Sequence, residues 1–539
     1  MNARRNNRRR GWIPASAGIL AATLVSLIAL GGCTEPNAQD DVLDVAFQEQ
    51  ISNLDRTFTT KREYIILSQL IDDFLFAVNP DTLDYEPLLA KSYEFVDKTT
   101  LDVTLRKGVT FHDGSPLSAD DVVYTYRFVI DPANGARAQQ HVSKWLDSVE
   151  KTGPRSVRFH LSYAYPLALR DMAVTVPIRK AGSYTRDGEL DKGALVTREN
   201  GLGPYKVVKF DPGREVLLKR YDGYYDGSPK GQPAIDTIRI HTISDWGSQQ
   251  AGLLSGELDW LYNVPGDIAE NLAASGYAKR EVGSSMRIGF LVLDAKGITG
   301  ADNPLTKLKV RRGINHAINR QSIVDNIVRG GAKVIDSSCH PVQFGCEQDV
   351  RHYDFDPDKA RQLFADAGYP NGFPMTVWAY RNPYVAEAMA QDLRNVGINV
   401  DLRYVKLPVL NKARSGGQIQ SYFGTWGAGG TPDADATLSV LWNADTDRNF
   451  SGDAMVSRKV AEASQTRDKA VRRKLYSQVL KRIADQAYYV PLYAFPQNYV
   501  LSNRLDFPAP KDGMPRLYRA RWSPPEPDEA SGSAAGAQE

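Results

Sequence analysis

The side chains of this 539-residue chain that are best suited to covalent chemistry are its three cysteine thiols. Two of them, Cys339 and Cys346, flank residues 340–345, a segment rich in turn-forming residues. In an exported chain, an even pair of cysteines predicts a disulfide, here one that closes a small loop. The alternative is a metal site that includes the nearby His340 and His352. The spacing matches none of the usual zinc patterns and an oxidising compartment favours the disulfide, so we expect no metal site.

The third cysteine, Cys33, lies at the end of an export leader. Five arginines within residues 4–10 precede an apolar run at 18–30, and two glycines separate that run from Cys33, which is typical of a signal peptide. The Leu-x-Gly-Cys ending resembles a bacterial lipobox, in which the cysteine becomes the lipid-bearing N-terminus. We therefore expect a lipoprotein signal peptide at 1–32, lipid (palmitate) on Cys33 and a tether at 33–40. The alternative is an uncleaved membrane anchor.

Sequence motifs for catalysis are missing from the chain. It has no Gly-x-Ser-x-Gly, no His-Glu-x-x-His and no phosphate-binding Gly-x-x-x-x-Gly-Lys-Ser/Thr. Acidic residues at 354–358 begin like a calcium loop but lack its glycine and final glutamate, so an acidic helix N-terminus is the better interpretation. Carboxylate pairs of the glycoside hydrolase kind stay open, because their spacing is spatial. We expect no enzyme activity and no cofactor.

Composition limits the class of protein. The chain is too long for one ordinary core, and its 42% hydrophobic and 24% charged residues are typical of a globular protein. No second apolar run reaches membrane-spanning length. Loss of the five leader arginines brings the formal net charge from +2 to −3, which offers no electrostatic footprint for nucleic acid.

The elements that must position these residues alternate between short strands and amphipathic helices, as in an α/β or α+β protein. The order strand, helix, strand over residues 375–405 suggests a parallel sheet. The pattern predicts strands at 43–47, 101–106, 156–161, 204–210, 216–220, 375–380 and 398–405, and helices at 62–78, 122–130, 309–329, 386–396 and 466–486. Ser118 and Asp121 have the spacing of a capping box that opens the helix at 122–130.

Several segments, taken together, resemble the solute-binding proteins that serve peptide, nickel and oligosaccharide ABC importers (bacterial extracellular solute-binding proteins, family 5). The resemblance covers essentially the whole chain after the leader, and the order of the blocks makes it specific. The blocks lie at 101–124, with its Phe-His-Asp-Gly at 111–114, at 203–208, 221–225, 252–259, 310–320 and 356–369.

The resemblance implies a type II periplasmic-binding-protein-like α/β fold of two lobes, with an extra α+β domain inserted in the first. We expect a periplasmic or cell-envelope, lipid-anchored, monomeric receptor. It would capture a peptide or peptide-like solute between the lobes and deliver it to an ABC permease and its ATPase, with no nucleic acid as partner. The expected parts are lobe I at 41–82, 201–282 and 488–522, the inserted domain at 83–200, lobe II at 283–487 and a disordered tail at 523–539.

In peptide binders of this class, an arginine after a strand of the second lobe holds the ligand carboxylate. Arg381 stands at that place, between Trp378 and Tyr380 on one side and an Asn-Pro pair on the other. A guanidinium forms a bidentate, charge-assisted pair with a carboxylate. We therefore name Arg381 as a candidate ligand residue, with Trp378 and Tyr380 beside it. An ordinary surface role for Arg381 is the alternative.

The same binders hold the ligand ammonium with an aspartate in a tryptophan-containing segment. Here that segment, 424–435, has glycine or threonine at the expected acidic positions, and the nearest carboxylates are displaced. Either Asp433 turns toward the ligand, or the ligand has no free α-ammonium. Trp426 is a candidate wall of the cleft, with a core position as the alternative.

Three other functions remain as alternatives. A receptor of this class that binds a metal chelate, haem or an oligosaccharide is the nearest. An extracytoplasmic hydrolase would need a nucleophile or carboxylate pair in the cleft. A signalling or chaperone role would use the same fold.

Overall fold

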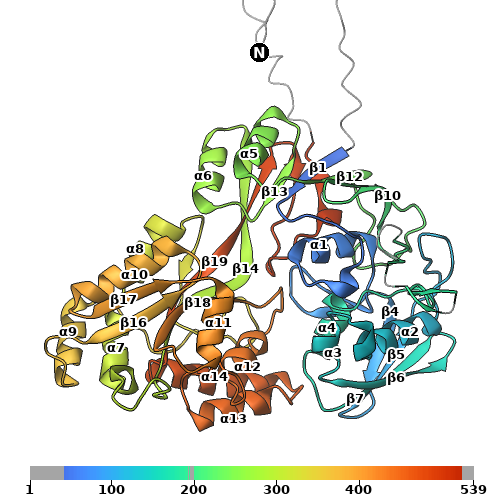
Figure 1. The fold of residues 1–539 in the computed structure, drawn as a ribbon. Helices are drawn as coiled ribbons and strands as arrows, with labels where there is room; N and C mark the ends of the chain where they lie inside the picture. Colours follow the sequence, from blue (N-terminus) through green and yellow to red (C-terminus); the bar gives the residue numbers. More distant parts are fainter. Residues whose placement is uncertain (1–41, 188, 192, 195–198, 525–539) are drawn as a thin grey trace, which may run out of the picture. The chain divides into compact units, whose positions relative to one another are not determined.

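Two long strands connect the halves of this protein, whose computed structural model describes residues 42–187, 189–191, 193–194 and 199–524. Strand β14 spans Ala278–Leu293 and pairs antiparallel with β19, Tyr489–Ser502. Their ladder is interrupted between Ser284 and Ile288, where Met286 has a φ of 50°. Figure 1 shows the two strands running side by side from one half to the other. We use the name hinge strands for β14 and β19.

The hinge strands belong to one large sheet. Among the described residues it has eleven strands in the order β10-β11-β12-β1-β13-β19-β14-β18-β16-β17, with β15 paired to β19. The bounds are β1 Val42–Phe47, β10 Tyr205–Asp211, β11 Glu215–Arg220, β12 Thr237–Thr242, β13 Trp260–Tyr262, β15 Lys333–Val334, β16 Pro374–Ala379, β17 Asn399–Tyr404 and β18 Ser421–Gly427. Strands β16 and β17 are parallel, as the strand–helix–strand pattern predicted.

Lobe I, as we use the term, is the half of the sheet that contains β1 and β10 to β13. Apolar side chains cover both faces of this half, and the residues after β19, such as Phe507 and Leu517, complete one of the two clusters. The helices here are α1 Arg62–Ile71, α5 Trp246–Ser255 and α6 Gly266–Ala274, with a 3-10 turn, η1, at Arg56–Phe58 and a small β20–β21 pair at Leu505–Asp506 and Arg521–Trp522.

The inserted domain carries its own sheet, in the order β4-β5-β7-β6, and its own apolar core around Trp145 and Phe159. Its helix α2 begins with the capping box that the Ser118 spacing predicted. The elements are β2 Phe76–Val78, β3 Tyr85–Pro87, β4 Ala90–Phe95, β5 Thr100–Leu105, α2 Ala119–Ile130, α3 Gln139–Val142, β6 Leu146–Gly153, β7 Ser156–Leu161, α4 Ala168–Val174, β8 Thr185–Arg186 and β9 Glu189–Leu190.

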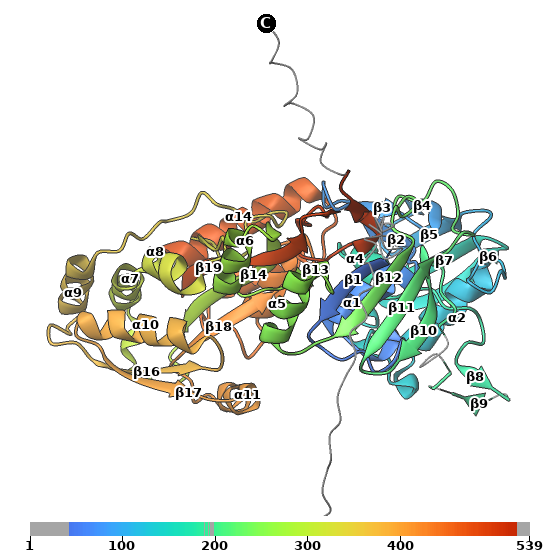
Figure 2. The same ribbon diagram turned by 90° about the horizontal axis from the view of Figure 1, so that it is seen from above.

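Lobe II is the half of the sheet that contains β15 to β18. Helices α7, α9 and α10 pack on one face and α11 to α14 on the other, around two separate apolar clusters. Figure 2 shows α7, α9 and α10 together from above. The helices are α7 Leu308–Ala317, α8 Arg320–Ile323, the π-helical η4 Val324–Val328, α9 Pro357–Asp366, α10 Pro383–Asn395, α11 Leu407–Ser415, α12 Asp435–Trp442, α13 Ala454–Ala463 and α14 Lys469–Asp485.

Two predicted helices are shorter than expected. The helix predicted at 62–78 ends at Ile71, because the carboxylates of Asp72 and Asp73 turn away to ion pairs and the chain continues into β2. The helix predicted at 309–329 breaks at Ile318, which is extended. The break lets the Arg320 guanidinium donate to three backbone carbonyls, at Ile335, Tyr353 and Pro491. A tertiary contact therefore outweighs helix periodicity in both places.

The leader, Cys33, the tether and residues 525–539 of the tail lie outside the described residues. Over the part of the chain that is described, we find no helix with the length and apolar character needed to cross a bilayer.

Candidate functional site

A cavity of about 380 Å³ lies where lobe I and the inserted domain face lobe II. One wall is formed by η1, the start of α1 and α4. The opposite wall is formed by the end of β18, the glycine-rich loop 427–431 that follows it, and the first turns of α12. A volume of this size suits a small solute, and a position between two lobes is where ligand sites commonly occur. We call this space the interlobe cavity.

Trp426, at the end of β18, contributes an aromatic side chain to the interlobe cavity. Its indole Nε1 donates to the Ala436 carbonyl at 2.8 Å, and the Arg448 guanidinium lies over its ring at 5.3 Å. The indole is therefore held in one orientation and forms part of the wall, at the position the sequence suggested.

The loop after Trp426 needs glycine. Gly429 and Gly430 have φ values of 59° and 75°, which favour glycine. A Cβ on Gly430 would lie 2.7 Å from Met514 Cγ, and one on Gly429 would lie 3.6 Å from the Arg170 Nη2 of the inserted domain. Because these positions carry no side chain, the backbone of the loop lies close to Met514, to Arg170 and to the interlobe cavity.

Asp433, a predicted candidate, does not line the interlobe cavity. It is buried, and its carboxylate accepts from Arg472 Nη2 at 2.7 Å and from the Tyr476 hydroxyl at 3.2 Å. The expectation that Asp433 turns toward a ligand is thus corrected: its charge is already paired within lobe II. It borders a separate cavity of about 610 Å³ between β3, β4 and α14.

Asp435, two residues later, is the lobe II carboxylate that lines the interlobe cavity. It stands at the start of α12, is 4% exposed and accepts a hydrogen bond from Ser464 Oγ. Burial, and after it the neighbouring Asp433, raises the pKa of the Asp435 carboxyl to about 6. Asp435 forms no ion pair with any residue that the structure describes, so its carboxylate is suited to receive a ligand ammonium. The sequence indicated only that the acidic residues of this segment are displaced from the expected positions. The fold shows that Asp435, and not Asp433, lines the cavity.

Arg381 follows β16 and joins two other arginines. Its Nη1 donates to Thr425 Oγ1 at 3.0 Å, and Arg287 Nη1 on β14 donates to the same oxygen at 3.2 Å. Arg62, at the start of α1, donates to Gln497 Oε1 and to the Gly513 carbonyl, each at 3.0 Å. Within the described ranges, none of these three arginines has a carboxylate within 4.0 Å. We call Arg62, Arg287 and Arg381 the arginine triad.

The arginine triad is electrostatically strained. Burial first, then the positive charges of Arg381 and Arg62, lowers the pKa of the Arg287 guanidinium to about 10. One member of the triad approaches the interlobe cavity: Arg287 Nη2 lies 3.0 Å from the place of a Cβ on the cavity residue Gly427. Three cations without a carboxylate make this region suited to an anion.

The two residues before Arg381 take different places. Trp378 is buried in the lobe II core, with the Arg403 guanidinium 5.4 Å from its ring centre. Tyr380 is half-buried and packs under Arg381, whose guanidinium lies 4.7 Å from its ring centre. The structure thus gathers Tyr380 and Arg381 but leaves Trp378 in the core.

A disulfide joins Cys339 and Cys346, and the loop it closes supports the cavity wall. Gln343 Nε2 donates to the carbonyls of Thr431 and Asp433 at 3.1 and 3.0 Å, and the Phe344 backbone pairs with residues 432 and 434. This loop therefore fixes the segment that leads into Asp435. Neither cysteine spacing nor turn composition indicated that contact.

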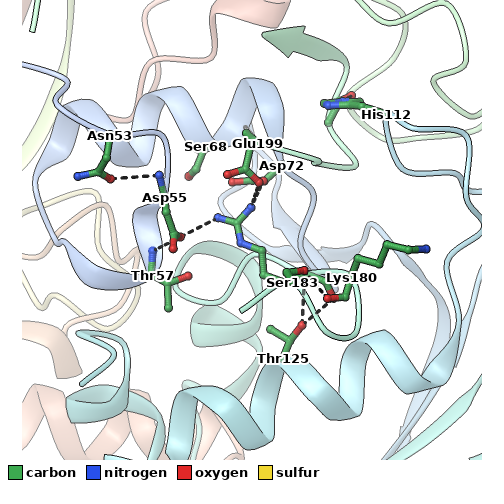
Figure 3. Close-up of polar contacts among 12 residues, drawn as sticks. Asn53, Asp55, Thr57, Ser68, Asp72, His112, Thr125, Lys180, Ser183 and Glu199 are labelled. Carbon is green, nitrogen blue, oxygen red and sulfur yellow. Dashed lines mark hydrogen bonds and ion pairs between the residues drawn. The ribbon is translucent and has the colours of Figure 1, made fainter. Parts of the chain in front are cut away.

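A buried ionic network fixes the opposite wall. The Arg179 guanidinium contacts the carboxylates of Asp55, Asp72 and Glu199, which Figure 3 shows converging on one point. Asp55 also caps η1 by accepting from the Thr57 backbone at 2.9 Å. Because η1 begins at Arg56, the network holds that residue against the interlobe cavity. Arg56 was not singled out in the sequence.

No cluster of three or more His, Cys, Asp or Glu side chains that could hold a metal ion occurs among the described residues. His340 and His352, the alternative zinc ligands, take other partners: His340 Nε2 lies 3.3 Å from Ser284 Oγ, and His352 contacts Asp336 and Asp354.

The sequence and the fold were compared with known proteins. Heme-binding protein A of Haemophilus influenzae is 26% identical over 471 residues, which are 80% of this chain and 82% of that protein. The glutathione-binding protein GsiB of Escherichia coli K12 is 26% identical over 423 residues, 75% of this chain and 80% of the relative.

Among solved structures, HbpA2 of Haemophilus parasuis superposes with a TM-score of 0.78 at 22% identity, over 89% of this chain and all of the other. NikA of Brucella suis in complex with Fe(III)-EDTA has a TM-score of 0.77 at 21% identity, with the same coverage. These structures share the two-lobed α/β fold described above.

A family description also matches most of the chain. Residues 84–449 match the middle region of the bacterial extracellular solute-binding proteins, family 5. That stretch covers parts of both lobes and the inserted domain, including β18, Arg381 and the loop closed by Cys339 and Cys346. The chain therefore belongs to the bacterial extracellular solute-binding proteins of family 5.

Proposed function

We propose that this receptor captures an anionic peptide or peptide-like solute in the interlobe cavity and delivers it to the permease of an ABC importer. The observation that carries the proposal is the arginine triad, three cations with no carboxylate partner among the described residues, of which Arg287 lies against the cavity residue Gly427. Carboxylate groups complement guanidinium groups in charge and in planar geometry.

Asp435 supports the peptide part of the proposal. It offers the cavity one carboxylate from lobe II, where a ligand ammonium would be held, while Trp426 offers an aromatic wall. Peptides carry both an ammonium and a carboxylate. The relatives named for glutathione and the solved structure of a dipeptide-binding protein with Met-Leu agree with a solute of this class.

A metal chelate or haem is the second candidate, because the same arginine triad would also attract the carboxylates of such a solute. Two relatives or neighbours carry names of that kind, heme-binding protein A and NikA with Fe(III)-EDTA. In either case the proposed function involves no covalent step.

We further propose that the protein has the domain bounds given above, that it is a monomer and that it carries a lipid anchor on Cys33.

The test begins with mass spectrometry of small molecules that are released when the purified protein is denatured. Thermal shift against a library of peptides and peptide-like acids, alongside haem and iron chelates, then identifies what stabilises it. A true ligand raises the melting temperature progressively, with the logarithm of its concentration once it is well above the Kd. Stabilisation by acidic peptides supports the proposal, whereas stabilisation by haem or chelates alone supports the second candidate. A response only to neutral sugars contradicts both.

A further inference from the structure

The guanidinium of Arg56 is buried on the wall of the interlobe cavity without a counter-ion. Arg56 is 7% exposed, and its Nε and Nη1 atoms are buried with no hydrogen-bond partner. Among the residues that the structure describes, the Arg56 side chain has no hydrogen-bond partner and no ion-pair partner. Its Cζ atom lies 5.8 Å from the centre of the Phe74 ring.

The two carboxylates near Arg56, those of Asp72 and Asp171, are already held by other arginines. The nearby Arg170 Nη1 donates to Asp171 Oδ1 at 2.8 Å, and Trp145 Nε1 donates to Asp171 Oδ2 at 2.8 Å. Both oxygens of that carboxylate are therefore occupied. Burial first, then Arg170, lowers the pKa of Arg56 to about 9, which still leaves it charged at neutral pH.

Other buried arginines of this protein show what a balanced site looks like. Arg516 forms two hydrogen bonds to the Asp512 carboxylate, Arg472 pairs with Asp433, and Arg179 contacts three carboxylates. A buried cation without such a partner costs free energy in the unliganded protein. Arg56 faces the cavity instead of a carboxylate.

We propose that Arg56, with Arg170 and Lys144 beside it on the cavity wall, forms a second anion subsite, so that the solute carries two acidic groups. The first group would lie toward the arginine triad, where Arg287 approaches the cavity residue Gly427, and the second at Arg56 on the opposite wall. A solute with acids at both ends would therefore contact cations on both walls of the cavity. This inference rests on the proposed function only for the use of the interlobe cavity as the ligand site.

A small anion tests the subsite directly. Thermal shift in sodium sulfate is compared with sodium chloride at equal ionic strength, for the wild type, Arg56→Met, Lys144→Met and Arg381→Met. Lys151→Met is the control, since it removes an exposed cation from the inserted domain that pairs with Asp120 away from the cavity. Sulfate should stabilise the wild type and the control, and part of that shift should be lost in Arg56→Met. Lys144 is exposed, so Lys144→Met should lose a smaller part of the sulfate-dependent shift in melting temperature. This variant replaces Arg56→Met in the test if Arg56→Met fails to fold.

A two-acid peptide tests the bridge. Glutathione and its glycine monoethyl ester, which lacks one carboxylate, are titrated by calorimetry into the wild type, Arg56→Met and Arg381→Met. The Kd of each variant for glutathione should be at least about 30-fold higher than that of the wild type, as expected when one partner of a buried charge pair is removed. The ester should bind the wild type more weakly than glutathione does. The variant that lacks the arginine for the glycine carboxylate should bind the ester and glutathione equally, whereas the other variant should still prefer glutathione.

The outcomes separate the two proposals. If the sulfate shift of Arg56→Met and of Lys144→Met equals that of Lys151→Met, the second subsite is wrong. If Arg381→Met weakens glutathione and Arg56→Met does not, the proposed function stands without the second subsite. If the sulfate shift depends on Arg56 but no acidic peptide binds, the subsite stands and the proposed function fails.

Discussion

Two lobe II residues of opposite charge, Arg381 and Asp435, each have an electrostatic cost before a ligand arrives. Arg381 shares one hydroxyl acceptor, Thr425, with a second arginine, so neither guanidinium is neutralised. Asp435 is a buried carboxylate whose neighbour Asp433 is also negative. Groups placed in this way gain more from a ligand of opposite charge than exposed groups would.

For Arg381, we expect Arg381→Ala to weaken an anionic solute by about 2–4 kcal/mol, because it removes one partner of a buried charge pair. Isothermal calorimetry with the solute identified by mass spectrometry measures the change. Arg403→Ala is a matched control, since Arg403 stacks on the buried Trp378 and pairs with Asp401 at the surface. An unchanged affinity for Arg381→Ala would remove this residue from the site.

For Asp435, we expect a pH-dependent effect on stability. Its pKa is raised from 3.8 to about 6, so folding is penalised above that pH, where the buried carboxyl is ionised. Asp435→Asn should therefore stabilise the unliganded protein by about 3 kcal/mol near neutral pH. The gain should shrink as the pH falls through 6 toward 4, because the folded protein then takes up the proton, and it should vanish below 3.8, where the carboxyl is protonated in both the folded and the unfolded protein.

Urea unfolding of the wild type and Asp435→Asn at several pH values checks this expectation. The same variant should bind a solute with a free ammonium less tightly, in spite of its greater stability. A stability difference that does not vary with pH would contradict the raised pKa, and an unchanged affinity would show that Asp435 holds no ammonium.

Among the elements, the loop closed by the disulfide acts on the site through backbone contacts. Loss of the cross-link in Cys339→Ser should destabilise the protein by about 2–3 kcal/mol, the chain-entropy value for so short a loop. It should also weaken ligand binding, because residues 431–434 lose the support of Gln343 and Phe344. Thermal unfolding and calorimetry of the oxidised protein, the reduced protein and Cys339→Ser measure both effects. Equal ligand affinity in all three forms would limit the loop to a role in stability.

Elements were predictable where local pattern and tertiary contacts agree. The strand–helix–strand unit around β16, α10 and β17 was recognised within a few residues, and so was the capped start of α2. The helices predicted at 62–78 and 309–329 failed where side chains such as Asp72 and Arg320 found distant partners. Sequence periodicity carries no information on such contacts.

The candidate site was predictable only in part, for a related reason. Trp426 and Arg381 stand in segments that the family resemblance marks, and the structure places Trp426 on the wall of the interlobe cavity and Arg381 beside it. The choice between Asp433 and Asp435 depends on Arg472, which is distant in sequence. Arg56 lies in no recognisable sequence motif. It stands out only in the structure, where its buried Nε and Nη1 atoms have no hydrogen-bond partner among the described residues.

At the scale of the whole molecule, the lobes meet on more than one side of the cavity. The hinge strands join them, and away from the hinge Lys469 Nζ contacts Asp84 Oδ1 at 2.8 Å while Arg467 donates to the carbonyls of residues 97 and 98. These exposed contacts are individually weak. They therefore permit the lobes to separate and to close again around a solute, as hinge-bending receptors do.

If the proposed lipid anchor on Cys33 is correct, the placement of the receptor depends on this residue. We expect Cys33→Ser to release the protein from membranes, because the lipid-bearing N-terminus cannot form on serine. Membrane fractionation of cells that express the wild type or Cys33→Ser, with metabolic labelling by a radioactive fatty acid, measures the change. A variant that stays in the membrane fraction without label would support an uncleaved leader as the anchor instead.

The position of β19 has a consequence for how the chain is made. Lobe II and the inserted domain are each formed by one continuous stretch of sequence, so each has its contacts available soon after synthesis. Lobe I instead receives β19 between β13 and β14, and its core needs Tyr499, Leu501 and Leu517 from the last part of the chain. Such distant pairings form late. A chain shortened just after Ala494 would therefore keep the part of β19 that completes the lobe II cores but would lack the part that completes lobe I, and only a longer polypeptide could enclose a solute.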